Sequence, residues 1–366
     1  MPPIRYVSRW ITRTFLLLTL LLCCYNEILV YHFNRSSWPE IHCRFDNCTR
    51  MLLIADPQLL GLTYEKTILS GLARYDSDRY LKNTFQQALQ FTQPHIICFL
   101  GDLLDEGNVA SPQEFQSYIQ RFRNIYQTDN SIKFKMISAF HQVVHVPGDN
   151  DIGGENGEYI SNLNIHRFEE AFTQRDIFDY ESNLRFFKIN RMMLDFTNPD
   201  KTHNHQKLRI GLSHAPILIG GGPLLRSVIN ELDPHIIFSG HWHESRIFLY
   251  PSTKVINFYD KAVKSFNLKD LKEKQHNYLE IMVPTSSYRM GKVNIGIGYA
   301  VLENYNLRYT VLWLPNRFVY LLIYVFWLLF AICMSLVFRM MTRCPFRKIS
   351  KFNQTQYQRI SDAIPD

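Results

Sequence analysis

The chain has 366 residues, of which 46% are hydrophobic and 20% charged, and its formal net charge is +7. Apart from two apolar segments near its ends, this length leaves room for one large domain or two small ones. The seven cysteines do not form a dense disulfide framework. The positive charge owes much to basic residues near the two ends and no nucleic-acid-binding motif is present, so we expect no nucleic-acid partner.

The first apolar segment is centred on residues 15–30 and follows Arg5, Arg9 and Arg13. A cleaved signal peptide has the same basic start and apolar core, but no small-x-small cleavage site is evident. We therefore interpret residues 14–33 as an uncleaved transmembrane helix after a cytosolic segment of residues 1–13. A cleaved signal peptide stays the alternative.

Short apolar runs between residues 50 and 290 end repeatedly in carboxylate, amide or imidazole side chains. Their lengths of four to six residues are typical of buried strands. The polar ends are Asp56 and Gln58 after "MLLIA", Asp102 and Asp105 after "HIICFLG", Asp149 after "VVHVPG", His214 after "LRIGLS", and His241 and His243 after "HIIFSG".

Amphipathic segments lie between these strands. Residues 78–93 carry one broad apolar face and stop before Pro94, and residues 112–127 do the same after Pro112. Residues 200–206 and 261–276 are predicted to be an exposed loop or charged helix. The alternation of strands and helices predicts a layered α/β domain whose sheets are covered by helices.

The polar strand ends predict a metal site. One such end is usually a turn, and a lone histidine is more often a surface or core residue than a ligand. Five converging ends, however, would place carboxylates and imidazoles together, where they would repel one another without a cation. A mixed set of carboxylate and imidazole ligands suits Zn, Mn or Fe better than Ca. We therefore predict two divalent metal ions, with manganese preferred.

The order of these motifs resembles the calcineurin-like metallophosphoesterase superfamily, whose pattern is D-x-H, G-D-x-x-D, G-N-H-[DE], a later H, and G-H-x-H. The corresponding residues here begin at Asp56, Gly101, Gly148, His214 and Gly240. The resemblance implies a four-layer sandwich of two mixed sheets flanked by helices, here between two transmembrane helices. It also implies that Asp102 bridges two metals, that Asp56 and His243 complete one site, and that Asp149, His214 and His241 complete the other.

Two positions depart from the family pattern. Gln58 stands where the family has the histidine of D-x-H, and its amide oxygen is a weaker metal ligand. Asn150 replaces the histidine of G-N-H-D, and an amide can donate a hydrogen bond but cannot transfer a proton at neutral pH. We assign Asn150, Asp151 and Asp105 to the catalytic surroundings of the metals, with Asp151 as a carboxylate that orients its neighbours. His145 is interpreted as a structural histidine.

A narrower resemblance rests on "GDLLDEG", "PGDNDIG" and "VPTSSYR". These stretches are similar to a branch that removes ethanolamine phosphate from the second mannose of glycosylphosphatidylinositol (GPI) anchors. The resemblance implies that GPI-anchored proteins are the substrate and that transport receptors are possible partners. It implies a location in the early secretory pathway: endoplasmic reticulum exit sites, the ER–Golgi intermediate compartment and the Golgi. A dilysine ending is absent.

The second apolar segment, residues 317–338, has the length of ~20 apolar residues that a bilayer core requires. Basic residues precede the first span and follow the second, which places residues 1–13 and 339–366 in the cytosol and residues 34–316 in the lumen. The sequons at Asn34 and Asn47 are then predicted to be glycosylated, and the one at Asn353 would be cytosolic.

The cysteines outside the apolar spans have separate interpretations. Cys43 and Cys48 flank a short lumenal loop, where a disulfide is plausible, and Cys98 lies in an apolar strand of the core. Cys344 is interpreted as an inert cytosolic thiol, with palmitoylation as the alternative.

Two other functional readings stay open. One is an inactive relative that keeps the fold and binds GPI-anchored cargo or transport receptors, which the replacements at Gln58 and Asn150 favour. The other is a lumenal phosphatase or nucleotide phosphodiesterase that acts on soluble substrates. Arg289 is a candidate phosphate contact or an ordinary surface ion pair.

Overall fold

The computed structural model describes residues 4–45, 47–126, 142–155, 158–197, 207–219 and 221–343, with side chains from residue 10 to residue 340. The chain divides into two compact units, residues 1–316 and residues 317–366. The predictions for residues 200–206, Cys344 and the sequon at Asn353 lie outside the described residues, as do the side chains of Arg5 and Arg9.

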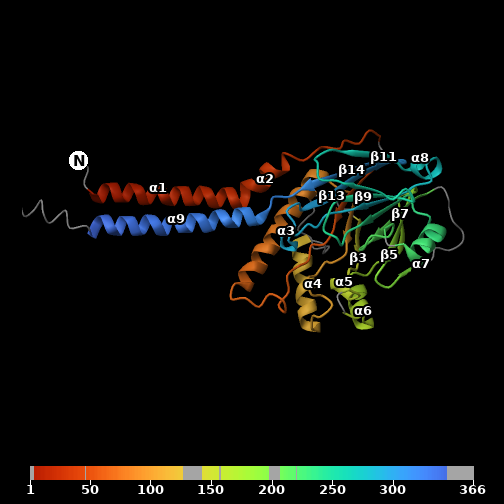
Figure 1. Ribbon diagram of the computed structural model, residues 1–366, viewed down its shortest axis with the longest axis horizontal. Coiled ribbons are helices and arrows are strands. Elements are labelled where there is room, and N and C mark those ends of the chain that lie inside the picture. Colours follow the sequence, from red (N-terminus) through yellow and green to blue (C-terminus); the bar gives the residue numbers. More distant parts are fainter. Residues whose placement is uncertain are drawn as a thin grey trace, which may run out of the picture. The chain divides into compact units, whose positions relative to one another are not determined.

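The first unit contains two mixed sheets (Figure 1). The six-stranded sheet has the order β11-β14-β13-β1-β2-β3, and the eight-stranded sheet has the order β10-β9-β12-β8-β7-β5-β4 with β6 paired to β5. The strands of the first are β1 (Cys48–Ile54), β2 (Ile96–Leu100), β3 (Gln142–Val146), β11 (Lys264–Asn267), β13 (Gly296–Glu303) and β14 (Asn306–Trp313); those of the second are β4 (Ile177–Tyr180), β5 (Leu184–Asn190), β6 (Asp195–Phe196), β7 (Leu208–Ser213), β8 (Ile236–Ser239), β9 (Arg246–Tyr250), β10 (Lys254–Asn257) and β12 (Tyr278–Met282).

Helices cover the outer faces of these sheets. The long helices of the first unit are α3 (Ser70–Thr92) and α4 (Pro112–Tyr126), and the shorter ones are α5 (Asp149–Ile152), α6 (Asn162–Ala171), α7 (Gly222–Ser227), η3 (Val228–Leu232), α8 (Leu268–Glu273) and the 3₁₀ turn η4 (Tyr288–Met290). A continuous helical segment precedes them, made of α1 (Ile4–Cys24), η1 (Tyr25–Leu29) and α2 (Val30–Arg35), and the second unit begins with α9 (Arg317–Arg343).

The main core lies between the two sheets. Alternate residues of each strand point inward, so Leu53 and Cys98 of the first sheet share one apolar cluster with Phe186 and Phe238 of the second. The intervening residues point outward, and Phe99 of β2 packs against Phe122 of α4 with ring centroids 5.1 Å apart. Both faces of each central strand are therefore buried, which explains the continuous apolar runs in the sequence.

The predicted helices are confirmed with one change of boundary. α4 matches the prediction, whereas α3 begins eight residues before the predicted start at residue 78 and ends, as predicted, just before Pro94. Residues 261–276 were expected to be a loop or a charged helix, and this expectation is wrong in part, because residues 264–267 form the edge strand β11. Strand β11 pairs with β14 and packs Phe266 against the core.

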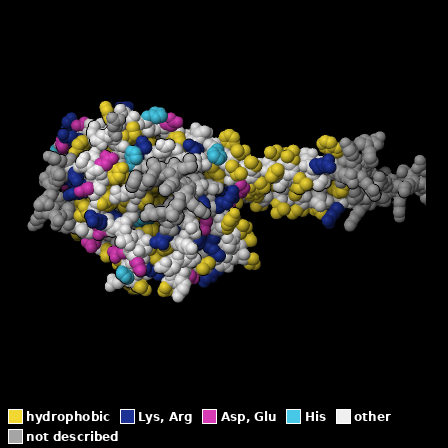
Figure 2. Space-filling view, turned by 180° about the vertical axis from the view of Figure 1, so that it is seen from behind, with side chains coloured by type: hydrophobic (Ala, Val, Ile, Leu, Met, Phe, Trp, Pro, Cys, Tyr) yellow, Lys and Arg dark blue, Asp and Glu magenta, His cyan; other side chains and the backbone are white. Residues whose placement is uncertain are grey.

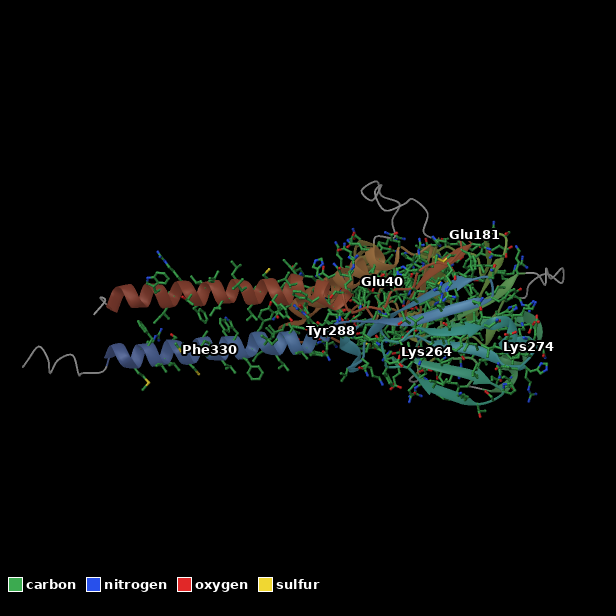
Figure 3. All side chains as sticks on the ribbon, turned by 90° about the horizontal axis from the view of Figure 1, so that it is seen from above. Glu40, Glu181, Lys264, Lys274, Tyr288 and Phe330 are labelled. Carbon is green, nitrogen blue, oxygen red and sulfur yellow. A yellow bond between two sulfur atoms is a disulfide. The ribbon has the colours of Figure 1, made fainter. Side chains whose placement is uncertain are left out.

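The two long terminal helices are apolar enough to cross a membrane. Residues 10–35 and residues 317–340 form candidate spans with mean hydropathies of 1.8 and 2.7. Figure 2 shows hydrophobic side chains covering the helical segments, while charged side chains gather over the sheet domain. Phe330 of α9, labelled in Figure 3, is 49% exposed, as expected of a side chain in a candidate membrane span.

Two cysteine predictions are confirmed. Cys43 and Cys48 form a disulfide, with Cα atoms 5.8 Å apart, and Cys98 is fully buried in the core. Asn47 is exposed and open to glycosylation, whereas Asn34 lies half-buried in the last turn of α2. Glycosylation at both positions stays a prediction.

A buried carboxylate in β12 holds the loop that follows β7. Glu280 is fully buried and accepts hydrogen bonds from the backbone N–H groups of Ile217 (2.9 Å) and Leu218 (2.7 Å). We expect Glu280→Ala to lower the free energy of unfolding by about 1–3 kcal/mol, because it leaves two buried donors without a partner. Thermal unfolding in detergent measures the loss. The exposed Glu273→Ala variant is the control, and an unchanged Tm for Glu280→Ala would contradict the assignment.

Candidate metal centre

Each predicted ligand follows the carboxyl end of a central strand. Asp56 follows β1, Asp102 follows β2, Asp149 begins α5 after β3, His214 follows β7, and His241 and His243 follow β8. The backbone at Asp56, Gln58, Asp102, His241 and His243 has φ between 40° and 75°. Such left-handed residues are strained unless glycine, and their concentration in three neighbouring loops is typical of a functional site.

The structure brings the six predicted Asp and His ligands together in two groups that share Asp102. One group contains Asp102, Asp149, His214 and His241, the other contains Asp56, Asp102 and His243, and the candidate ligand atoms within each group all lie within 4.8 Å. His214 Nε2 lies 3.0 Å from Asp149 Oδ1 and 3.5 Å from Asp102 Oδ1, and His243 Nε2 lies 3.5 Å from Asp56 Oδ1. The predicted ligand assignment for these six residues is therefore geometrically consistent.

Hydrogen bonds fix which nitrogen of two histidines faces the cluster. The Nδ1–H of His214 donates to the carbonyl oxygen of Leu100 (2.8 Å), which leaves Nε2 free for a metal. His241 is turned the other way: its Nδ1 lies 3.1 Å from His214 Nε2, while its Nε2 lies 3.1 Å from a carboxylate oxygen of Glu155. Glu155 therefore orients His241, although no sequence motif had pointed to it.

Asp151 stabilises the two loops that carry Asp102 and Asp149. It is fully buried and accepts hydrogen bonds from the backbone N–H groups of Leu103 (3.1 Å), Leu104 (3.0 Å) and Gly148 (2.9 Å). These bonds join the loop after β2 to the loop after β3. A side chain at Gly148 would collide with the Asp102 carboxylate, so the glycine permits the close approach of the two loops.

The two amides that replace family histidines both face Asp102. Asn150 donates from its backbone N–H to Asp102 Oδ1 (2.9 Å) and from Nδ2 to Oδ2 (3.2 Å). Gln58 Nε2 lies 3.0 Å from Asp102 Oδ2 and 3.3 Å from His243 Nε2. Both side chains thus act as hydrogen-bond donors to the shared carboxylate, and metal ligation by Gln58 would require its amide to rotate.

Asp105 does not join the ligand groups formed by the described residues. Burial, together with Glu106 and Glu65, raises the pKa of Asp105 to about 6. Arg289 forms an ion pair with Glu65. Of the two roles predicted for this arginine, phosphate contact or surface ion pair, the structure shows the ion pair. Sequence reasoning missed Glu106, which is fully buried and accepts from the backbone of Thr63 and Tyr64 beside the site.

The cluster is strained electrostatically without a cation. Burial, with Asp149, Asp56 and Asp151 nearby, raises the pKa of Asp102 well above its usual range. Burial alone would lower the pKa of His214, but Asp102, Asp149 and Asp56 together raise it well above its usual range. Each of the two groups combines two buried carboxylates with one or two imidazoles, a donor set that favours Mn, Zn or Fe over Ca. The residues present therefore fit two divalent metal ions.

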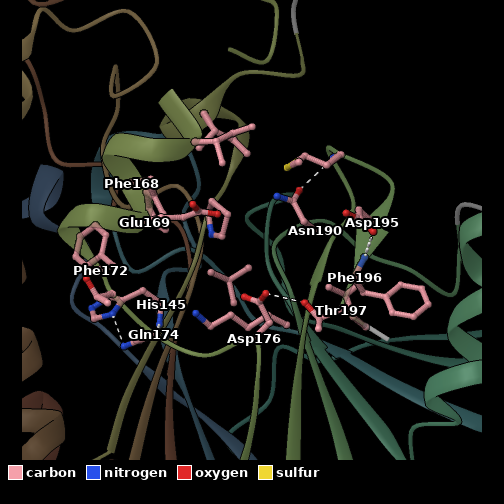
Figure 4. A pocket seen from close by; sticks show the side chains of 18 residues that line it. His145, Phe168, Glu169, Phe172, Gln174, Asp176, Asn190, Asp195, Phe196 and Thr197 are labelled. Atoms are coloured by element: carbon pink, nitrogen blue, oxygen red, sulfur yellow. Dashed lines mark hydrogen bonds between the residues drawn. The ribbon is translucent and has the colours of Figure 1, made fainter. Parts of the chain in front are cut away.

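A separate pocket of about 310 Å³ shares the turn between β3 and α5 with this centre (Figure 4). His145 lines it, accepts a hydrogen bond at Nδ1 from Gln174 (3.0 Å) and stacks on Phe99 with centroids 5.1 Å apart. Burial lowers the pKa of His145 to about 3, so the ring is neutral at physiological pH. The interpretation of His145 as a structural histidine is confirmed.

The sequence matches the calcineurin-like phosphoesterase family over residues 49–245, which is more than half of the chain. Metallophosphoesterase 1 of Cricetulus griseus is 27% identical over 189 residues, covering 50% of this chain and 44% of that protein. The Metallophosphoesterase 1 homolog of Caenorhabditis elegans is 23% identical over 302 residues, covering 70% of this chain and 77% of that protein. The matched part thus spans less than half of the Cricetulus protein.

Among solved structures, a metallophosphoesterase from Sphaerobacter thermophilus covers 72% of this chain and 88% of its own, with 11% identity and a TM-score of 0.35.

We expect Glu155→Gln to weaken binding of the metal held by His241 by about 10–100-fold, because the carboxylate that orients the imidazole is lost. Isothermal titration calorimetry of the metal-free protein with Mn²⁺ measures the affinity. Glu158→Gln is the matched control, since Glu158 is close in sequence but contacts Tyr64 and Asn108 instead of a ligand. Equal affinities for both variants would remove Glu155 from the site.

We also expect metal binding to strengthen with rising pH. The raised pKa values of Asp102 and His214 mean that the folded, metal-free cluster holds protons that the unfolded chain has released near neutral pH. Its stability therefore falls as pH rises, while a metal displaces these protons. The increase in Tm caused by Mn²⁺ should be larger at pH 8 than at pH 6. A pH-independent increase would refute this account.

Proposed function

Since the chain belongs to the calcineurin-like phosphoesterase family, we propose that it is a metal-dependent phosphodiesterase that removes an ethanolamine-phosphate side branch from the second mannose of GPI anchors. Phosphoesterase activity follows from the family and the ligand cluster. The GPI substrate rests on the resemblance of the "GDLLDEG", "PGDNDIG" and "VPTSSYR" stretches to one branch of that family.

The observation that carries the proposal is the pair of ligand groups joined by Asp102. Two divalent ions held in this way would supply Lewis acidity and a water of lowered pKa for attack on a phosphate. Asp102 would be shared between them, with Asp56 and His243 on one side and Asp149, His214 and His241 on the other. Manganese is the proposed metal, and Zn or Fe meets the same ligand chemistry.

The protein's own side chains would position these groups and supply hydrogen bonds. Glu155 orients His241, Asp151 holds the loops that carry Asp102 and Asp149, and Asn150 offers an amide donor beside the shared carboxylate. The amides at 58 and 150 transfer no proton at neutral pH. We therefore expect catalysis by charge stabilisation, with a smaller contribution from general acid catalysis than in relatives with histidine there.

The two candidate membrane spans support a substrate that is itself held in a membrane. We propose a lumenal domain of residues 34–316 between spans of residues 14–33 and 317–338. The proposed location is the early secretory pathway, from endoplasmic reticulum exit sites through the intermediate compartment to the Golgi. GPI-anchored proteins would be the substrates, and the reaction would aid their transport out of the endoplasmic reticulum.

A second candidate is an inactive relative that binds GPI-anchored cargo or transport receptors. The amides at Gln58 and Asn150 favour it, because both replace histidines of the family pattern. The six ligand side chains brought together in the cluster oppose it.

The purified full-length protein in detergent, loaded with Mn²⁺ and given GPI that carries ethanolamine phosphate, should release ethanolamine phosphate. Asp102→Asn is the control, since it weakens both metal sites at once. We expect two Mn²⁺ per wild-type chain and a loss of activity of at least about 10²-fold in the variant.

Release by the wild type alone supports the phosphodiesterase. Absence of release despite two bound ions would refute the proposed substrate and shift the weight to cargo binding, while hydrolysis of soluble nucleotides instead would favour a general phosphodiesterase.

A further inference from the structure

The metal ligands lie at the edge of the sandwich from which the chain continues into its second apolar helix. β1 is antiparallel to β13, and β13 is antiparallel to β14, so β1 and β14 run in the same direction. Leu53 near the end of β1 pairs with Gly298, which pairs with Val311 near the end of β14. The ligand-bearing loops after β1 and β2 therefore share an edge with Trp313, four residues before α9 begins.

The end of the first apolar helix is fastened to the same edge. The indole N–H of Trp38, three residues after α2, donates to the carbonyl oxygen of Trp313 (2.8 Å). The hydroxyl of Tyr80 in α3 donates to the carbonyl oxygen of Pro315 (2.9 Å). The first unit thus has one end that carries the metal centre and both connections to the apolar helices.

Helix α3 runs beside η1 and α2 in the same direction. Arg79 forms an ion pair with Glu27 and donates to its carbonyl oxygen (3.0 Å), and Gln87 accepts from Arg35 (3.4 Å). Further along, the ring of Phe91 packs edge-on against Trp38, with centroids 5.4 Å apart. The order of these contacts is the same in both segments, so they run in the same direction.

The start of α3 therefore lies toward the α1 end of the first helical segment. A separation of 52 residues relates the Glu27–Arg79 and Arg35–Gln87 contacts. Leu72, in the first turn of α3, precedes Arg79 by seven residues and so lies on the α1 side of the Glu27–Arg79 contact. Figure 1 shows the loop before α3 reaching back toward the level of α1.

This loop and the first turns of α3 expose an apolar surface, which we call the 62–75 patch. Its six exposed members are Leu62, Tyr64, Ile68, Leu69, Leu72 and Tyr75. Ile68 is fully exposed, and Leu69 and Leu72 are 64% and 62% exposed. Lys66 is the exposed charged residue within these bounds. Leucine and isoleucine flanked by tyrosines and a lysine are the composition of a surface that enters the lipid headgroup region.

The 62–75 patch is firmly joined to the metal centre. It begins four residues after Gln58, and the buried Glu106 accepts hydrogen bonds from the backbone N–H groups of Thr63 and Tyr64. The hydroxyl of Tyr64 lies 3.2 Å from Glu158, on the loop that follows α5. Movement of the patch would therefore move the rim of the site.

We propose that the 62–75 patch docks into the surface of the lipid bilayer and holds the metal centre over the membrane, so that its substrate is a phosphoester carried by a lipid of that same bilayer. The proposal rests on the membrane spans of the proposed function. Its occupant is a bilayer and not a protein, because α3, which carries part of the patch, is joined through Arg79 and Gln87 to a segment that itself has the length and hydropathy of a membrane span.

The first test locates the patch. An environment-sensitive fluorescent amino acid is placed at position 68 of the full chain, reconstituted in lipid nanodiscs with or without brominated lipids. The control position is Lys274, exposed beyond α8 at the opposite end of the sandwich, where β12 begins (Figure 3). We expect quenching by brominated lipid at position 68 and none at position 274. Absence of quenching at position 68 would overturn the proposal.

The second test asks whether docking serves the reaction. The triple substitution Ile68→Asn, Leu69→Ser and Leu72→Gln is compared with Val255→Ser, which changes a similarly exposed apolar residue on β10. We expect at least a fivefold loss of hydrolysis of a lipid-embedded phosphodiester by the triple variant, and unchanged hydrolysis of soluble bis(p-nitrophenyl) phosphate. Equal losses on both substrates would show a folding defect in the variant and contradict a docking role.

The two tests separate this inference from the proposed function. If the protein hydrolyses soluble and lipid phosphodiesters but not GPI, the GPI substrate fails while quenching at position 68 still supports docking. If it hydrolyses GPI without quenching at position 68, the docking surface fails and the proposed function stands.

Discussion

The structure depends on placing three buried carboxylates in two adjoining groups that share Asp102. Asp56, Asp102 and Asp149 are at least nine-tenths buried and come from three strand ends of one sheet. Burial and the neighbouring carboxylates raise the pKa of Asp102, whereas hydrogen bonds from His214 and His241 lower the pKa of Asp149 despite its burial. A bound cation would relieve the repulsion between the carboxylates. The left-handed backbone at Asp56 and Asp102 adds strain that only a well-packed scaffold can hold. The surrounding hydrogen bonds act mainly to keep this arrangement in place.

The two sheets pack face to face and so bring the carboxylates and the imidazoles together. The carboxylates come from the first sheet, while His214, His241 and His243 come from the second. The apolar cluster between the sheets therefore sets the distance between the two halves of the ligand set. Loop contacts such as Asp151 with Leu103 and Leu104 then fix the approach to within hydrogen-bonding distance.

The same end of the sandwich joins the helical segments. Trp38 and Tyr80 bond to the backbone of residues 313 and 315, close to the loops that carry the ligands. Chemistry and attachment are thus concentrated at one end. The two amides at Gln58 and Asn150 donate hydrogen bonds to Asp102, and neither side chain can transfer a proton near neutral pH.

The sequence by itself indicated the central strands β1, β2, β3, β7 and β8, most of the long helices, and the six Asp and His residues that the structure brings together, because buried strands need continuous apolar runs and their polar ends stand out against them. It also indicated the apolar spans and the Cys43–Cys48 pair. Only the tertiary structure decided that Glu155 orients His241 and that Glu106 holds the loop beside the site. Residues 264–267 became a strand for the same reason: their pairing with β14 and the burial of Phe266 outweigh a locally polar composition. These outcomes depend on contacts between segments far apart in the chain, which local pattern does not encode.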